Sequence, residues 1–231
     1  MGLYSGLIGM MASIVSLLVT VRRDQTERER EPNDKVSRRT IEREYHQRSR
    51  LLNRLDLIYK DYLNQSLERT IPLQIAFDQL VGKASQGLTQ VLPVLSRDKT
   101  IIQSTSLLDL FERYGGLKAP DILLLGEPGA GKTTALIEFA SCITERARAE
   151  LQHPIPVYLP LSTWRDGRTT FVEWMVKQLA VLYQVPSRLA KHWIEEDQLL
   201  FLLDGLDEIS DHASRIACIK QLNAFVQEHP V

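Results

Sequence analysis

One stretch of the sequence has the residue types and the spacing that phosphate binding requires. Residues 126–134 contain the pattern G-x-x-x-x-G-K-[ST], known as the P-loop. Glycines permit a close backbone approach there, so that successive N–H groups point at phosphate oxygens. The candidate cofactor-binding residues are Gly126, Glu127, Pro128, Gly129, Ala130, Gly131, Lys132, Thr133 and Thr134.

Three side chains of this loop predict distinct chemistry. Lys132 would bring a positive charge to the β- and γ-phosphates of a nucleotide, and the hydroxyl of Thr133 suits a ligand position of Mg²⁺. Thr134 is either a helix-surface residue or a contact to the α-phosphate. The flanking sequence fits this interpretation, because an apolar run at residues 121–126 predicts a buried strand and residues 135–151 are helix-like.

A second acidic site follows another apolar run. Residues 199–203 predict a buried strand, and Asp204 ends it. A strand that ends in aspartate, paired with a P-loop, is the Walker B arrangement, in which the carboxylate holds Mg²⁺. Asp207 and Glu208 follow, and a carboxylate in this place could orient or deprotonate an attacking water. The alternative is that both are solvated loop acids.

The elements between these two sites predict the fold. Residues 155–161 form a third strand candidate, and two prolines favour an edge position for it. Helical stretches near residues 169–184 and 186–197 separate it from the Walker B strand. Strands that alternate with helices indicate an α/β fold with a parallel sheet.

Taken together, these segments resemble a known family. The segments GEPGAGKTT, IPVYLPLS and LLFLLDGLDE resemble NACHT-type STAND P-loop NTPases over residues 107–231, and Gly205 with the acid pair behind it is the most specific element. The resemblance implies an ATP-dependent signalling switch that binds Mg-ATP, hydrolyses it slowly and forms a homo-oligomer when activated. The NTPase domain would occupy residues 119–231.

By position, the resemblance also implies a role for each site residue. Lys132 would bind phosphate, and Thr133 and Asp204 would hold Mg²⁺. Asp207 or Glu208 would be the catalytic residue that supports hydrolysis, with Glu208 the first choice for activating water. The alternative is a nucleotide-binding scaffold without significant turnover. The sequence has neither the LSGGQ-like segment of an ABC-type transport ATPase nor the N-K-x-D element of a GTPase.

The resemblance also implies an incomplete sheet. In this family the next strand lies between the P-loop strand and the Walker B strand, and it would come after Val231. We therefore expect the middle of the sheet to be empty, with unpaired backbone groups, and the chain to be a fragment of a longer protein. On this ground we expect residues 1–231 to bind nucleotide weakly or not at all.

The first twenty residues after Met1 form a separate region. Residues 2–21 carry no charge, and as a helix they would be about 30 Å long, the thickness of a bilayer core. Arg22 and Arg23 follow, which predicts a single membrane-spanning helix with the NTPase domain in the cytoplasm. The alternatives are a helix buried in a soluble N-terminal domain of a cytoplasmic protein and a secretory signal, which would need a basic start that is absent here.

The remaining residues predict connecting segments. Residues 22–70 form a charged helical connector, whose apolar stripe from Ile41 to Leu67 is typical of an amphipathic helix that packs on the globular part. A self-associating coil and a contact with lipid head groups are alternatives. Residues 71–118 form a linker with short helices. With 28 basic and 29 acidic residues, the balance of charge argues against a nucleic-acid partner.

Overall fold

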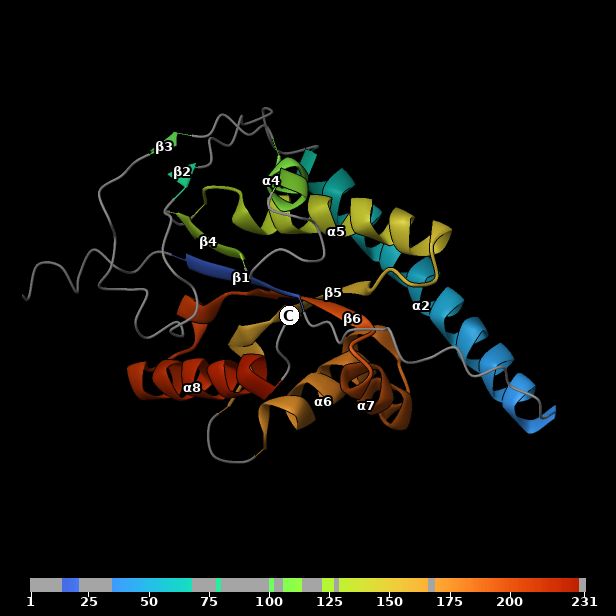
Figure 1. Cartoon of the computed structure of the whole chain (residues 1–231). Coiled ribbons are helices and arrows are strands. Elements are labelled where there is room, and N and C mark those ends of the chain that lie inside the picture. Colours follow the sequence, from blue (N-terminus) through green and yellow to red (C-terminus); the bar gives the residue numbers. More distant parts are fainter. Residues whose placement is uncertain are drawn as a thin grey trace, which may run out of the picture.

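A four-stranded sheet lies at the centre of the fold, with the strand order β4-β1-β6-β5 (Figure 1). The computed structural model describes residues 14–20, 35–67, 78–79, 100–101, 106–113, 122–126, 129–165 and 169–228. The four strands are β1 (Ile14–Thr20), β4 (Ile122–Gly126), β5 (Ile155–Pro160) and β6 (Leu199–Asp204). A second pair consists of β2 (Asp78–Gln79) and β3 (Thr100–Ile101).

The directions of the strands confirm a mixed α/β fold with a parallel part. β5 and β6 pair in parallel, and β1 is antiparallel to both β4 and β6. Since β1 runs opposite to both of its neighbours, β4 and β6 run in the same direction. Their carboxyl ends therefore meet at one edge of the sheet, and this is where the P-loop and Asp204 are found. β5 lies at the end of the strand order, as its prolines predict.

The membrane helix predicted for residues 2–21 is wrong for the part of that range that the structure describes. Ile14–Thr20 form strand β1, and residues 2–13 lie outside the described residues. The sequence IVSLLVT is rich in β-branched residues, which fit a pleated, buried surface. Among the residues that the structure describes, no helix has the length and the apolar character that a bilayer span requires.

Strand β1 also corrects the expectation of an empty position in the sheet. It pairs with β4 on one side and with β6 on the other, so that Leu17 is opposite both Leu123 and Leu203. An open slot between these strands would leave two rows of backbone N–H and C=O groups without partners inside the fold, which is costly. Because β1 supplies those partners, the reason for expecting weak nucleotide binding no longer holds.

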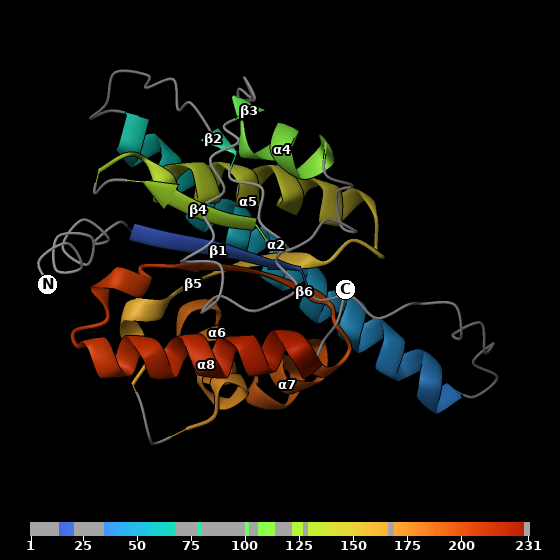
Figure 2. The same cartoon turned by 60° about the vertical axis from the view of Figure 1, so that its left-hand side comes forward.

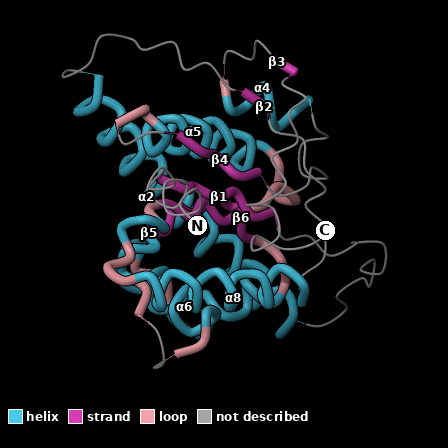
Figure 3. The backbone as a smooth tube through the Cα atoms, turned by 90° about the vertical axis from the view of Figure 1, so that its left-hand side faces the viewer, coloured by secondary structure: helices cyan, strands magenta, loops and turns pink. Residues whose placement is uncertain are grey.

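Helices cover both faces of the sheet (Figures 2 and 3). On one side lie α5 (Lys132–Ala149) and α4 (Leu107–Arg113), and on the other lie α6 (Phe171–Tyr183), α7 (Ser187–Glu195) and α8 (His212–Glu228). These bounds agree with the helices predicted near residues 135–151, 169–184 and 186–197 to within a few residues. The core between the layers includes the whole of β6, which is buried along its length.

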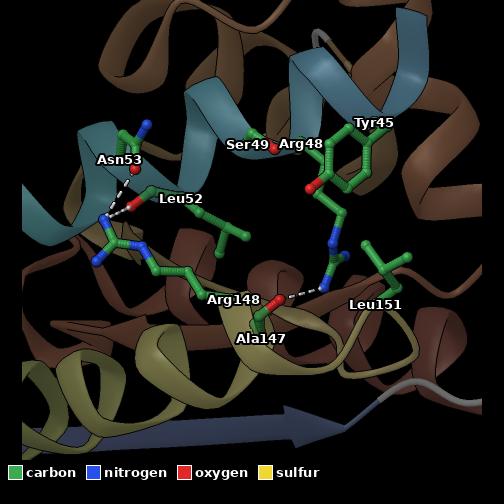
Figure 4. Close-up of a pocket in the computed structure, with 8 residues that line it drawn as sticks. All are labelled: Tyr45, Arg48, Ser49, Leu52, Asn53, Ala147, Arg148 and Leu151. Carbon is green, nitrogen blue, oxygen red and sulfur yellow. Dashed lines mark hydrogen bonds between the residues drawn. The ribbon is translucent and has the colours of Figure 1, made fainter. Parts of the chain in front are cut away.

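Helix α2 (Lys35–Leu67) packs on α5, as its apolar stripe predicts, and its first turns extend beyond the rest of the fold (Figure 1). Its buried face consists mainly of leucines and Tyr59. Arg48 crosses from α2 and donates a hydrogen bond from Nη2 to the carbonyl oxygen of Ala147 at 3.1 Å (Figure 4). The same nitrogen donates to the carbonyl oxygen of His153 at 2.5 Å. A cation at the carboxyl end of α5 also interacts favourably with the helix dipole. Arg148 ties the same two helices together by donating to Asn53 Oδ1 at 3.0 Å.

Candidate functional site

The P-loop joins the carboxyl end of β4 to the amino end of α5. Gly126 is the last residue of β4, and Lys132 is the first residue of α5. Glu127 and Pro128 lie outside the described residues. Gly131 caps the helix with φ of 80°, a left-handed conformation that a residue with a Cβ adopts only with strain. The glycine therefore lets the chain turn directly from the loop into the helix.

The first turn of α5 carries the side chains that sequence reasoning selected. The first N–H groups of a helix have no partner within it, and together with the helix dipole they favour an anion at this end. Lys132 is buried, with 9% of its surface exposed, and Thr133 and Thr134 follow it with partly buried side chains. This end of α5 therefore combines backbone donors with one lysine charge, which is what a phosphate group requires.

The structure brings Thr133 and Asp204 together, although they are far apart in the sequence. The hydroxyl Oγ1 of Thr133 donates to Oδ2 of Asp204 at 2.6 Å. Asp204 is 4% exposed, and its other oxygen, Oδ1, accepts the backbone N–H of Gly205 at 2.9 Å. The pairing of the P-loop with the end of the Walker B strand is thus a direct contact between two side chains.

Tyr158 is a member of this site that sequence reasoning missed. Its hydroxyl donates to Oδ2 of Asp204 at 3.0 Å, the oxygen that also accepts from Thr133. Burial, together with the charge and hydrogen bond of Asp204, raises the pKa of Tyr158 far above its usual range, so the phenol stays protonated and donates. The sequence carries no signal for this role, because it depends on the register between two strands: Tyr158 pairs with Leu202, two residues before Asp204 in the neighbouring strand.

The acid pair lies in the 3₁₀ turn η4 (Leu206–Glu208), directly after Gly205. Glu208 is exposed, and its charge contributes to raising the pKa of Tyr158, so its carboxylate lies within electrostatic range of the site. Asp207 is partly buried, and among the described residues its Oδ1 is a buried oxygen without a hydrogen-bond partner. Both candidate catalytic residues therefore lie beside the Asp204 end of β6.

The P-loop, Tyr158, Asp204 and the acid pair all lie within a match to a known protein family. Residues 121–228 match the model of the NACHT domain. The chain carries a NACHT domain, which belongs to the STAND family of P-loop NTPases. Neither the curated proteins nor the solved structures that were searched gave a match to the chain. The NACHT domain implies a nucleotide-binding NTPase module, and the P-loop, β6 and η4 all lie inside the matched residues.

The P-loop, Asp204 and the acid pair of η4 form the candidate site of the NACHT domain, which we call the NACHT site. Its side chains fit Mg²⁺, a hard cation that prefers oxygen ligands. Thr133 offers a hydroxyl and Asp204 a carboxylate, and the buried Oδ1 of Asp207 is an oxygen that lacks a partner within the described part of the chain. No group of three or more metal-ligating side chains occurs among the described residues. In nucleotide sites Mg²⁺ commonly takes one or two protein ligands beside phosphate oxygens.

The hollow drawn in Figure 4 is separate from the site that the P-loop, β6 and η4 form. It lies between α2 and α5, and its lining includes Tyr45, Arg48, Leu52 and Arg148. A second hollow lies between α2 and the segment that joins α6 to α7, and it is lined in part by Arg54 and Trp193. Neither hollow is lined by a residue of the P-loop, β6 or η4, so neither is the candidate nucleotide site.

A side chain at Gly205 would be both strained and crowded. Its φ is 75°, and a Cβ at this position would lie 2.9 Å from Oε2 of Glu208. We expect Gly205→Ala to lower the free energy of unfolding by about 1–2 kcal/mol for the left-handed backbone alone, and by more because Glu208 must move. Chemical denaturation of the nucleotide-free protein measures this change.

Gly129→Ala is the matched control for this prediction. Gly129 has φ of 78°, so alanine carries the same backbone strain there, but a Cβ would meet no atom within 4 Å. The excess cost of Gly205→Ala over Gly129→Ala therefore reports the contact with Glu208. Equal costs for the two variants would show that the Glu208 side chain does not pack against Gly205.

Proposed function

We propose that this chain binds Mg-ATP at the P-loop of its NACHT domain and hydrolyses it slowly, as an ATP-dependent signalling switch. The observation that supports the proposal most is the contact between Thr133 Oγ1 and Asp204 Oδ2, at 2.6 Å. It joins the P-loop to the acidic end of β6, as Mg-nucleotide binding in P-loop NTPases requires. The choice of ATP follows from the resemblance to the family.

In this proposal the residues of the chain act in the following way. Lys132 and the N–H groups at the start of α5 bind the phosphates, and Thr133 and Asp204 hold Mg²⁺. Mg²⁺, when bound, supplies positive charge that stabilises the phosphoryl group during transfer. Glu208 accepts a proton from the attacking water, and Asp207 is the second candidate for that role.

By resemblance to STAND proteins, we propose that the nucleotide state controls self-association of this chain into a homo-oligomer. We do not include a membrane anchor, because Ile14–Thr20 cannot pair with β4 and β6 as a strand and also span a bilayer as a helix.

Comparing ATP turnover with ATP binding tests the catalytic part of the proposal. We expect Glu208→Gln to reduce hydrolysis by about 10²- to 10⁴-fold, because a positioned general base contributes that much. The affinity for Mg-ATP, measured by calorimetry, should stay within a few-fold of wild type, because glutamine keeps the size of the side chain. Asp207→Asn serves as the comparison variant, and we expect it to have the smaller effect on turnover.

The outcomes separate this proposal from a nucleotide-binding scaffold. A wild-type protein that binds Mg-ATP but releases no phosphate above background would favour the scaffold. If Asp207→Asn abolishes turnover and Glu208→Gln does not, the water-activating role belongs to Asp207.

A further inference from the structure

The carboxylate of Asp204 accepts hydrogen bonds from the P-loop helix, from β5 and from the residue that follows β6. Oδ2 accepts from Thr133 Oγ1 at 2.6 Å and from the hydroxyl of Tyr158 at 3.0 Å. Oδ1 accepts from the N–H of Gly205 at 2.9 Å. Since Asp204 is buried, these donors fix both the position and the orientation of its carboxylate.

Tyr158 is itself held at both of its backbone groups. Its N–H donates to the hydroxyl of Tyr59 at 3.2 Å, and its carbonyl oxygen accepts from the hydroxyl of Tyr183 at 2.5 Å. Tyr59 also donates to the carbonyl oxygen of Pro156 at 3.0 Å. Both hydroxyls come from tyrosines that are almost fully buried, at 0% exposed for Tyr59 and 4% for Tyr183.

These contacts lie along the outer edge of β5. Pro156 and Pro160 have no N–H, so Tyr158 is the residue between them that can donate along this edge. Tyr59 and Tyr183 satisfy its N–H and C=O, and Thr163 Oγ1 donates to the carbonyl oxygen of Pro160 at 2.9 Å. Side-chain hydroxyls therefore replace the neighbouring strand that an edge lacks.

We propose that Tyr158 is a positioning residue for the metal site: its hydroxyl holds the Asp204 carboxylate ready for Mg²⁺, and Tyr59 and Tyr183 hold Tyr158. This inference rests on the proposed function, because it concerns the same site. A partner that orients a metal-ligating carboxylate commonly changes metal affinity by about 10- to 100-fold. Fixing the ligand beforehand lowers the conformational entropy that binding must remove.

The two tyrosines that support Tyr158 come from two different helices. Tyr59 belongs to α2, which precedes the NACHT domain in the chain, and Tyr183 belongs to α6. Helix α2 is therefore connected to Asp204 through two successive residues, Tyr59 and Tyr158.

The test is the Mg²⁺ dependence of ATP binding by wild type and by Tyr158→Phe, which removes one hydroxyl and keeps the ring. A fluorescent ATP analogue reports the affinity in EDTA and across a Mg²⁺ titration. We expect Tyr158→Phe to need about tenfold more Mg²⁺ for half-maximal enhancement of binding. In EDTA its affinity for the analogue should match that of wild type, because the hydroxyl of Tyr158 bonds to Asp204, whose proposed role is to hold Mg²⁺.

Tyr45→Phe is the matched control, because Tyr45 is an exposed tyrosine of α2 that lines the hollow in Figure 4. It should leave the Mg²⁺ titration unchanged. An unchanged titration in Tyr158→Phe would overturn the inference, and so would an equal loss of binding with and without Mg²⁺, which indicates a general structural role. A wild-type protein that binds the analogue in neither condition would instead overturn the proposed function, and the inference with it.

Discussion

Lys132→Ala is expected to weaken the binding of Mg-ATP by about a hundredfold or more. Lys132 is the first residue of α5, and only 9% of the surface of this residue is exposed, so it is a largely buried cation at the start of the helix. Truncating one partner of a buried charge pair costs about 2–5 kcal/mol, and each 1.4 kcal/mol is a tenfold change in the dissociation constant. Calorimetric titration of both proteins with Mg-ATP measures the difference.

Lys191→Ala is the matched control for this loss. Lys191 also lies in a helix, α7, but its side chain is 64% exposed and pairs with Glu195 at 3.6 Å. Its removal should leave both Mg-ATP binding and the midpoint of thermal unfolding unchanged. If Lys132→Ala binds Mg-ATP as tightly as wild type does while remaining folded, the phosphates are not held at the P-loop, and the proposed site is wrong.

The parts of the site that could be predicted from the sequence are those set by local spacing. The P-loop pattern places Lys132 and Thr133 at the start of a helix, whatever the rest of the chain does. The apolar run before Asp204 predicts a buried strand that ends in a carboxylate. Two parallel strands bring their carboxyl ends to the same edge, so the contact between Thr133 and Asp204 follows from the topology.

Tyr158 could not be found in this way, because its role depends on the register between two strands. Nothing in the segment IPVYLPL distinguishes a tyrosine that reaches Asp204 from one that packs in the core. Only the pairing of Tyr158 with Leu202 places the ring beside the end of β6. Tyr59 is less predictable still, because it comes from a helix 99 residues away in sequence from its partner.

Strand β1 shows why a charge-free segment is ambiguous. A run of apolar and small residues can be long enough to span a membrane as a helix. The same residue types also suit a strand buried between two others, because both environments exclude water. The β-branched residues of IVSLLVT favour the strand. What decides the matter is the position between β4 and β6: the resemblance to the family implies that it is vacant, but the sequence does not show that residues 14–20 fill it.

Leu17→Pro is expected to destabilise the whole NACHT domain, although it lies more than a hundred residues before the matched region begins. Leu17 is opposite Leu123 of β4 and Leu203 of β6. Proline removes an N–H from the ladder of a central strand and costs about 3 kcal/mol or more. In a chain of this size that corresponds to a fall of roughly 6–12 °C in the midpoint of thermal unfolding.

The same substitution should also weaken Mg-ATP binding, because β1 holds the strand that leads into the P-loop against the strand that ends at Asp204. Leu17→Ile is the control: it keeps the backbone N–H and the side-chain volume, so it should cost less than about 1.5 kcal/mol and leave Mg-ATP binding unchanged. If Leu17→Pro has the same midpoint of thermal unfolding and the same affinity for Mg-ATP as wild type, Ile14–Thr20 are not part of the sheet. The slot between β4 and β6 would then need a strand from elsewhere, since two rows of buried backbone groups cannot remain without partners.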